Sequence, residues 1–235
     1  MLALKLGESL PSNNAPAISP NTYSIQTTGT EYVTNDGAAA GLAVAIGSIS
    51  VWTKVSTMGA SGTLFRIAAD GSNFIQILYH AASNEMRFAY RGGATSKTAV
   101  ITDAIENDGK WYHILGTWST DLDELKIYLN GVLKDTNTDT LGEFAGTPSL
   151  FDIGQNTGDA NFYKGYISEF AFFSSIVSVS DVYIANQQPV NLTGMSGLEG
   201  YWKFNNGSGT LAHDSSGNRN TGTLVNSPTW TTDTP

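Results

Sequence analysis

The sequence contains no cysteine, so neither a disulfide framework nor a thiolate metal site can form. Charged residues make up only 14% of the chain, below the roughly 25% of an average globular domain. The polar surface must then consist largely of Ser, Thr, Asn and Gly, which suit turns and strands better than helices. The shortage of charge therefore favours a fold built from β-strands.

Long hydrophobic runs are also missing. No apolar stretch approaches the roughly 20 residues that a helix needs to span a bilayer. Near the N-terminus, Lys5 and Glu8 interrupt the short apolar stretch, so it does not form the hydrophobic region of a secretory signal peptide. The sequence predicts no membrane partner and shows no export signal of the Sec type.

Basic residues are outnumbered by acidic ones. The chain has 12 Lys and Arg against 21 Asp and Glu, a formal net charge of −9. A field of this sign repels a phosphate backbone, and the basic residues are not clustered along the sequence. Nucleic acid is therefore not an expected partner.

Short β-type runs separated by turn residues fill the chain from residue 21 onward. Residues 23–35 alternate as one strand, and residues 163–175 are apolar on both faces, which predicts a central strand. Asn130-Gly131 lies between two apolar runs, and both residues tolerate the positive φ of a type I′ hairpin turn. About a dozen strands at regular spacing predict an all-β fold, an antiparallel sandwich or barrel.

The two ends of the chain differ from its middle. Residues 1–20 contain three prolines and no periodic pattern, which indicates an extended N-terminal arm, either disordered or docked on a neighbouring subunit. We expect residues 21–235 to form a single sandwich. Within it we predict one short helix at 182–188, a connector at 186–197 and further strands at 198–230.

Three segments of the chain resemble the laminin-G-like, concanavalin-A-like family. They begin DGKWYHILGTWST at residue 108, FDIGQNTGDANFYKGYISEF at residue 151 and GYWKFNNGSGTLAHDSSGN at residue 200. The resemblance implies a jelly roll of two antiparallel sheets over residues 21–230. It says little about the ligand.

The order of these segments departs from the family pattern. In typical members the G-Y-W-x-F segment precedes the strand that lies here at 23–33, whereas in this chain it comes last. Either one sandwich is circularly permuted, or the end is the stub of a second repeat. Chain termini often lie close together, and a stub of this length could not bury a core, so permutation is favoured. Residues 201–204 are then expected to pair near the strand at 23–33.

Catalytic side chains are scarce in this pattern. Relatives of this sandwich include glycoside hydrolases, which need two carboxylates facing each other across a bond. The nearest candidates, Asp121, Asp123 and Glu124, lie in an expected turn rather than along a strand. The three histidines lack metal spacing, and His113 is expected to be a hydrogen-bonded structural residue. We predict that the protein is not an enzyme.

Calcium is the only cofactor that the sequence offers as a candidate. The loop GQNTGDAN places Gln155, Asn156, Asp159 and Asn161 close together, and Asp70 in a separate turn could add a ligand. Oxygen ligands of this kind suit calcium. Pentraxins, which are similar in fold, bind calcium through the loop at this position. The alternative is that Asp, Asn and Gly are simply the residues that tight turns require.

Aromatic residues offer a second type of binding site. Exposed Trp and Tyr side chains stack on sugar rings, whereas buried ones fill the interior of a sandwich. Core packing is the favoured interpretation for the aromatic residues found in strand-like runs, which are Trp52, Trp111, Trp118, Trp202 and Tyr201.

Two functional classes remain. The first is a non-catalytic virion structural protein of a bacteriophage, such as a capsid decoration, head-fibre or tail-associated protein with surface glycan adhesion. The resemblance to small marine phage proteins implies it, with contacts to other virion proteins or self-association through residues 1–20. The alternative is a lectin-like carbohydrate-binding module of a bacterial surface or secreted protein, which would be extracellular.

Overall fold

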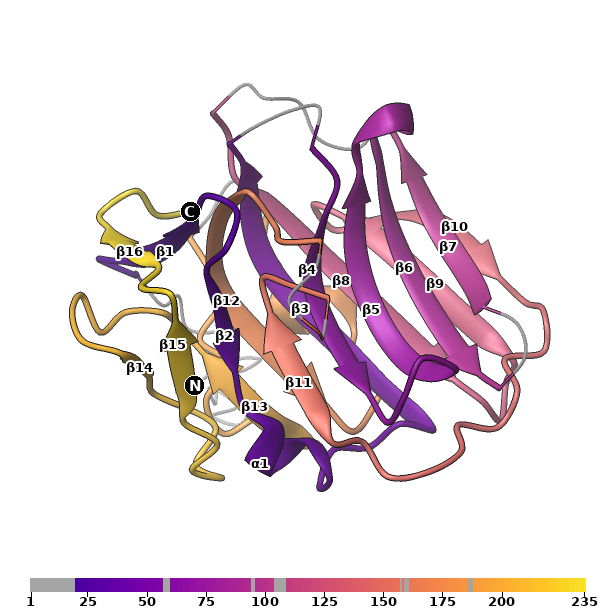
Figure 1. The fold of residues 1–235 in the computed structure, drawn as a ribbon. Helices are drawn as coiled ribbons and strands as arrows, with labels where there is room; N and C mark the ends of the chain where they lie inside the picture. Colours follow the sequence, from indigo (N-terminus) through magenta and orange to yellow (C-terminus); the bar gives the residue numbers. More distant parts are fainter. Residues whose placement is uncertain are drawn as a thin grey trace, which may run out of the picture.

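The computed structural model describes residues 20–56, 60–93, 96–103, 109–156, 158, 161–185 and 188–235. The predicted arm at 1–20 lies outside these residues except for Pro20, so its docking stays a prediction. The paired strands form two eight-stranded antiparallel sheets that pack face to face (Figure 1). The all-β, two-sheet sandwich predicted from the sequence is confirmed.

The first sheet has the order β10-β9-β8-β3-β12-β1-β16, and β13 also pairs with β12. The predicted hairpin is present, because φ is positive at both Asn130 and Gly131 between β9 and β10. As predicted, β12 is central, with β3 on one side and with β1 and β13 sharing the other. The strands are β1 (Ser24–Thr27), β3 (Ile46–Val55), β8 (Tyr112–Ser119), β9 (Glu124–Leu129), β10 (Val132–Asn137), β12 (Gly165–Phe173), β13 (Leu198–Trp202) and β16 (Thr229–Thr231).

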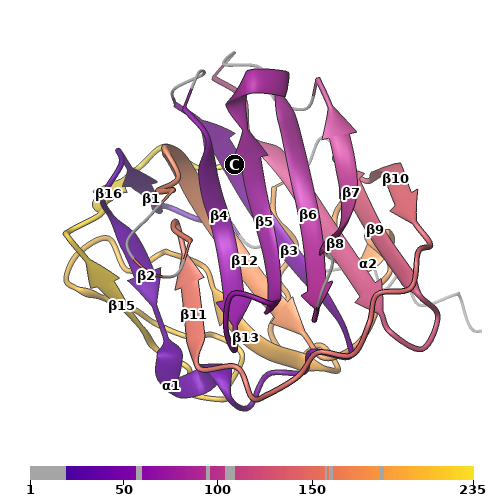
Figure 2. The same ribbon diagram turned by 45° about the vertical axis from the view of Figure 1, so that its right-hand side comes forward.

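The second sheet has the order β14-β15-β2-β11-β4-β5-β6-β7. Figure 2 shows β4 to β7 side by side on the face that is turned toward the reader. The strands are β2 (Tyr32–Thr34), β4 (Gly62–Ala68), β5 (Asn73–His80), β6 (Glu85–Gly92), β7 (Ser96–Thr102), β11 (Leu150–Ile153), β14 (Leu211–Ala212) and β15 (Gly222–Val225).

The single strand predicted at 23–35 is wrong, because the chain changes sheets within it. β1 belongs to the first sheet and β2 to the second. Between them, the Glu31 carboxylate accepts hydrogen bonds from the backbone amides of Thr28, Gly29 and Thr30 at 2.8–3.1 Å. Although partial burial opposes ionisation, the bonds from Thr28 and Thr30 lower the pKa of Glu31 to about 2. A carboxylate that caps three amides stabilises a turn where alternation alone predicts a continuous strand.

Among the described residues, helical structure is limited to single turns, α1 (Asp36–Ala39), η1 (Ala81–Ser83) and α2 (Val179–Val182). The helix predicted at 182–188 is therefore misplaced: of its described residues, 182–185 and 188, only Val182 is helical. α2 starts three residues earlier and ends where Tyr183 adopts extended dihedral angles. In the part of the chain that the structure describes, no helix is long and apolar enough to cross a membrane.

The C-terminal segment supplies strands to both sheets. The pairing of residues 201–204 with the strand at 23–33 is wrong in detail, because β13 pairs with β12 instead. β15 pairs with β2 and β16 pairs with β1, so the segment does reach both halves of that predicted strand. The Trp202 side chain is fully buried and donates a hydrogen bond from Nε1 to the Asn220 carbonyl oxygen at 2.8 Å.

The two outer faces of the sandwich are covered differently. The main core lies between the sheets. On the outer face of the first sheet, a second apolar cluster forms because residues 177–185 and 188–198 fold back over β8, β12 and β13. Its members are Leu115, Ala171, Phe173, Val177, Val182, Val190, Leu192, Leu198 and Tyr201. On the outer face of the second sheet, the described residues form only the small cluster of Ala68, Phe74 and Ala89.

Candidate functional site

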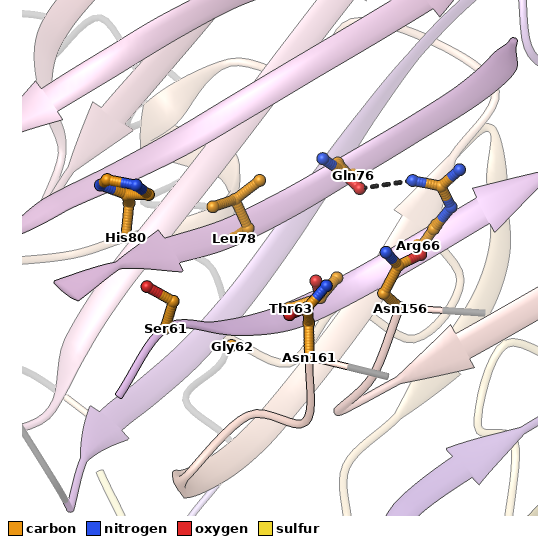
Figure 3. Close-up of a pocket in the computed structure, with 9 residues that line it drawn as sticks. All are labelled: Ser61, Gly62, Thr63, Arg66, Gln76, Leu78, His80, Asn156 and Asn161. Atoms are coloured by element: carbon orange, nitrogen blue, oxygen red, sulfur yellow. Dashed lines mark hydrogen bonds between the residues drawn. The ribbon is translucent and has the colours of Figure 1, made fainter. Parts of the chain in front are cut away.

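A pocket of about 220 Å³ lies on the outer face of the second sheet, beside the start of β4 (Figure 3). Its walls come from β4, β5 and the loop that follows β11. Most of its side chains are uncharged hydrogen-bonding groups, one is a guanidinium, and none of the described lining residues is a carboxylate. The lining residues are Ser61, Gly62, Thr63, Arg66, Gln76, Leu78, His80, Asn156 and Asn161.

The alternation of β5 places its polar residues on the pocket side. Ile75, Ile77 and Tyr79 point inward and belong to the main core. The intervening residues Gln76 and His80 point to the outer face and are half-buried. Since successive side chains of a strand lie on opposite faces, burying the apolar set forces the polar set outward.

The loop after β11 is held over β4 by backbone contacts. The Thr63 amide donates a hydrogen bond to the Asn161 carbonyl oxygen at 2.7 Å. A Cβ atom at Gly62 would lie 2.4 Å from the carbonyl oxygen of Phe162, so only glycine permits this approach. These contacts hold Asn161 at the pocket, which Asn156 also lines.

Arg66 supplies the positive charge of the pocket. Its Nη1 donates to Gln76 Oε1 at 2.7 Å, the dashed bond in Figure 3, and its guanidinium lies 3.8 Å from the centre of the Phe74 ring. The residue is only 7% exposed, and Nε has no hydrogen-bond partner among the described residues. Burial, with repulsion from Arg91, lowers the pKa of Arg66 to about 10.

A buried acid lies next to Arg66 across the sheet. Asp152 of β11 is the backbone partner of Arg66, and Gln76 of β5 is its partner on the other side. The Asp152 carboxylate accepts a hydrogen bond from Gln155 Nε2 at 3.0 Å, and both residues are buried. Within the described part of the chain, Arg66 forms no ion pair. Its charge is therefore offset by an amide oxygen and an aromatic ring rather than by a carboxylate.

The structure brings together only some of the predicted calcium ligands. Asn156 and Asn161 both line the pocket, but next to a guanidinium that repels a cation. Gln155 turns its amide toward Asp152. Asp159 lies outside the described residues, so its part of the prediction is untested.

Asp70 does not lie with Asn156 and Asn161 at the pocket, so its inclusion among the predicted calcium ligands is corrected. It lies in the turn between β4 and β5, whereas the loop crosses the opposite end of β4. Its carboxylate accepts hydrogen bonds from the Ser72 amide at 2.7 Å and from Asn73 Nδ2 at 3.1 Å, the role expected of a turn residue. In the described residues, no group of three or more His, Cys, Asp or Glu side chains could hold a metal ion.

The other candidates are structural. His113 is buried on the outer face of the first sheet, and Ser50 Oγ lies 2.8 Å from its Nε2, so the predicted structural histidine is confirmed. Burial lowers the pKa of His113 to about 3. Asp123 lies in the predicted turn between β8 and β9 and accepts a hydrogen bond from the Leu141 amide, whereas Glu124 is the first residue of β9 and pairs with Lys126. These acids lie outside the pocket.

Core packing is confirmed for most of the aromatic residues. Trp118, Trp202 and Tyr201 are fully buried and Trp52 is 9% exposed. Trp111 is half-buried and bonds Asp233 through its indole nitrogen at 2.9 Å. The sequence interpretation overlooked Arg66 and Gln76. The signal that could have identified them is that each is a polar residue between apolar residues in a strongly apolar strand, which predicts a side chain on the outer face.

Comparison with protein families gives one match. Residues 27–183, about two-thirds of the chain, match the family described as the concanavalin A-like lectin/glucanases superfamily. No curated protein matches the sequence.

Solved structures share the fold at low sequence identity. A protein from Bacteroides ovatus, named for an inferred carbohydrate-binding function, is 15% identical to this chain with a TM-score of 0.64. The match covers 90% of this chain but only 60% of that protein. The CBM40 module of a Ruminococcus gnavus sialidase, solved with α2,3 sialyllactose, is 14% identical with a TM-score of 0.58, covering 67% of this chain and 93% of the module. A pentraxin from Limulus polyphemus is 17% identical with a TM-score of 0.53, covering 71% and 83%.

Proposed function

The chain belongs to the concanavalin A-like lectin/glucanases superfamily, and on that premise we propose that it is a carbohydrate-binding module of a surface or secreted protein. The proposed site is the pocket between β4, β5 and the loop after β11. The observation that carries the proposal is the lining of this pocket, in which hydroxyl, amide and imidazole groups converge on a space on the outer face. Such groups donate hydrogen bonds to sugar hydroxyls and accept them.

The outer face of the second sheet is the less covered of the two outer faces, which supports a site there. The outer face of the first sheet carries its own apolar cover. The second sheet instead presents polar side chains from two adjacent strands, fixed by the core residues between them. Rigid presentation on strands lowers the entropy that a site loses on binding.

The size of the pocket supports a small ligand unit. Its volume of about 220 Å³ is below the range of about 300–1,000 Å³ that holds drug-sized ligands. Leu78 adds an apolar contact within the polar lining. A single sugar ring, which has polar hydroxyls and an apolar C–H face, matches both the size and the lining.

The lack of an acid in the described lining favours binding over catalysis. Glycoside hydrolysis needs a general acid and a second carboxylate on opposite sides of the scissile bond. Asp152 and Gln155 are buried, are bonded to each other and are not among the lining residues. We therefore propose a module that holds a sugar without cleaving it.

The solved structures support this reading through their fold and their names. Two of the three belong to carbohydrate-binding proteins by name, but their identities of 14–15% establish only a shared sandwich. Sialyllactose is the ligand of the Ruminococcus module and is not transferred to this chain. The virion role predicted from the sequence finds no support in these neighbours.

A glycan array probed with the labelled protein tests the proposal. Ser61 is exposed at the rim of the pocket, so Ser61→Trp should fill the entrance and abolish binding while leaving the core intact. Ser208→Trp, at an exposed position on the C-terminal segment, is the matched control and should bind as the wild type does. If no glycan binds, or if both variants bind equally well, the pocket is not a carbohydrate site.

A further inference from the structure

We propose that the sugar held in this pocket is acidic, and that its carboxylate or sulfate ester pairs with the guanidinium of Arg66. The inference rests on the proposed function and specifies the class of ligand. It depends on the position of Arg66, a buried cation at the pocket that has no acidic partner among the described residues.

Arg66 is a buried charge without an ionic partner. It is 7% exposed and forms no ion pair within the described residues. Buried charges are normally paired, because the loss of hydration is costly. The carbonyl oxygen of the Gln76 amide and the face of the Phe74 ring stabilise the cation only in part.

The guanidinium retains donors for a ligand. An arginine side chain has five N–H donors in a planar fork, and among the described residues the only hydrogen bond of Arg66 is the one from Nη1 to Gln76. Gln76 and the Phe74 ring hold the group in place, so an oxyanion would meet a preorganised fork. Planar carboxylates and sulfate oxygens can accept two parallel hydrogen bonds from such a fork.

The charges around the pocket favour an anion. The sequence has four arginines, and three of them, Arg66, Arg87 and Arg91, lie on β4 and β6 of the second sheet at positions that alternate with core residues. Repulsion from Arg91 disfavours the charge on Arg66, and a bound anion would relieve it. This basic face stands out in a chain with a net charge of −9.

Three acids lie on the same side and limit this field. Glu85 pairs with Arg87 at 2.6 Å and so neutralises one of the two arginines of this face that lie outside the pocket lining. Asp152 is buried on the strand next to Arg66 and is bonded to Gln155. Asp70 is exposed in the turn at the other end of β4. None of the three is bonded to Arg66, so the ligand supplies the oxyanion.

Isothermal titration calorimetry with matched pairs of sugars provides the test. The pairs are a glucuronate-terminated disaccharide and its methyl ester, sialyllactose and lactose, and galactose 6-sulfate and galactose. The methyl ester keeps the sugar ring and removes the charge. The first pair tests a uronic acid carboxylate, the second a sialic acid carboxylate and the third a sulfate ester. We expect the acidic member of at least one pair to bind about 10- to 100-fold more tightly than its neutral partner.

Two substitutions at Arg66 separate charge from fork geometry. Arg66→Gln should remove the preference for the acidic sugar, and Arg66→Lys should keep part of it. Arg219→Gln removes the same charge from an exposed position and is the control, with the preference unchanged. Melting curves of each variant confirm that the protein is folded.

The outcomes are distinct. Equal binding of acidic and neutral members by the wild type would overturn this inference and leave the carbohydrate site intact. A preference that persists in folded Arg66→Gln would also overturn it, because Arg66 would then only position Gln76 and Phe74. Binding of no sugar at all would overturn the proposed function together with the inference.

Discussion

The backbone amide of Val100 donates a hydrogen bond to the carboxylate of Asp135, 2.8 Å away, and so joins the edges of the two sheets. Val100 is on β7, the last strand of the second sheet, and Asp135 is on β10, the last strand of the first. Asn137 Nδ2 adds a bond to the Thr98 carbonyl oxygen at 3.3 Å. Side chains therefore satisfy backbone groups that an open edge would offer to another chain.

Asp135→Ala should destabilise the protein by about 1.5–3 kcal/mol, the usual contribution of a hydrogen bond to a charged group. The loss also leaves an edge amide free, so aggregation on heating should increase. Asp139→Ala is the control, because the Asp139 side chain is 67% exposed and ion pairs at the surface contribute about 0–1 kcal/mol. Urea unfolding of both variants measures the difference, and equal losses would contradict the edge-closing role of Asp135.

Trp202→Ala should cost about 3–5 kcal/mol, since Trp202 is fully buried against Phe151 and Phe170. Trp230→Ala, on the half-buried strand β16, should cost less. Removal of residues 198–235 should unfold the protein, because β2 loses its partner β15 and β12 loses its partner β13. A truncated chain that melts like the full-length one would show that the segment is not needed for the sandwich.

Glu169 should make the protein less stable as the pH rises. It lies at a bulge of β12 with φ +52, is 1% exposed and accepts a hydrogen bond from the Tyr201 hydroxyl. Burial, opposed by Lys203 and Asn21, raises its pKa to about 8. Between pH 4.5 and 8 the unfolded chain loses a proton that the folded chain keeps, so the free energy of unfolding falls across this window.

The side chain in Glu169→Gln does not titrate, so this variant should lose the fall in the free energy of unfolding that Glu169 causes. We expect that fall to be at most a few kcal/mol. Urea unfolding at pH 5, 6.5 and 8 compares the two proteins. Parallel pH profiles would show that Glu169 does not carry a proton in the folded state.

His113 should act in the opposite direction, at acid pH. Its depressed pKa of about 3 keeps it neutral in the folded protein, whereas the unfolded chain takes up a proton near pH 6.5. Stability should therefore fall as the pH drops from 6.5 toward 3. His113→Gln should reduce this loss relative to the wild type, and His213→Gln, at an exposed position, should not. Thermal melts from pH 4 to 7 provide the measurement, and identical slopes in the two variants would contradict the prediction.

Local chemistry in the sequence determined the fold class, the central strand and the hairpin. Asn130-Gly131 marks a turn because few other residue pairs accept positive φ at both positions. The apolar run of β12 likewise predicts a strand that is buried on both faces. In the structure one face of β12 packs against the main core and the other against the second apolar cluster. These features depend on neighbours in the chain and can be predicted without knowing the rest of the protein.

Only the tertiary structure decided where the chain changes sheets and which residues form the pocket. The pairing of β13 with β12, and the crossing of the loop after β11 over Gly62, arise from contacts between residues far apart in sequence. Arg66 and Asn156 are 90 positions apart and meet because β11 pairs with β4. A pattern of alternation shows that such residues point outward, but strand order and register determine which of them share one site, because those depend on the packing of the whole sandwich.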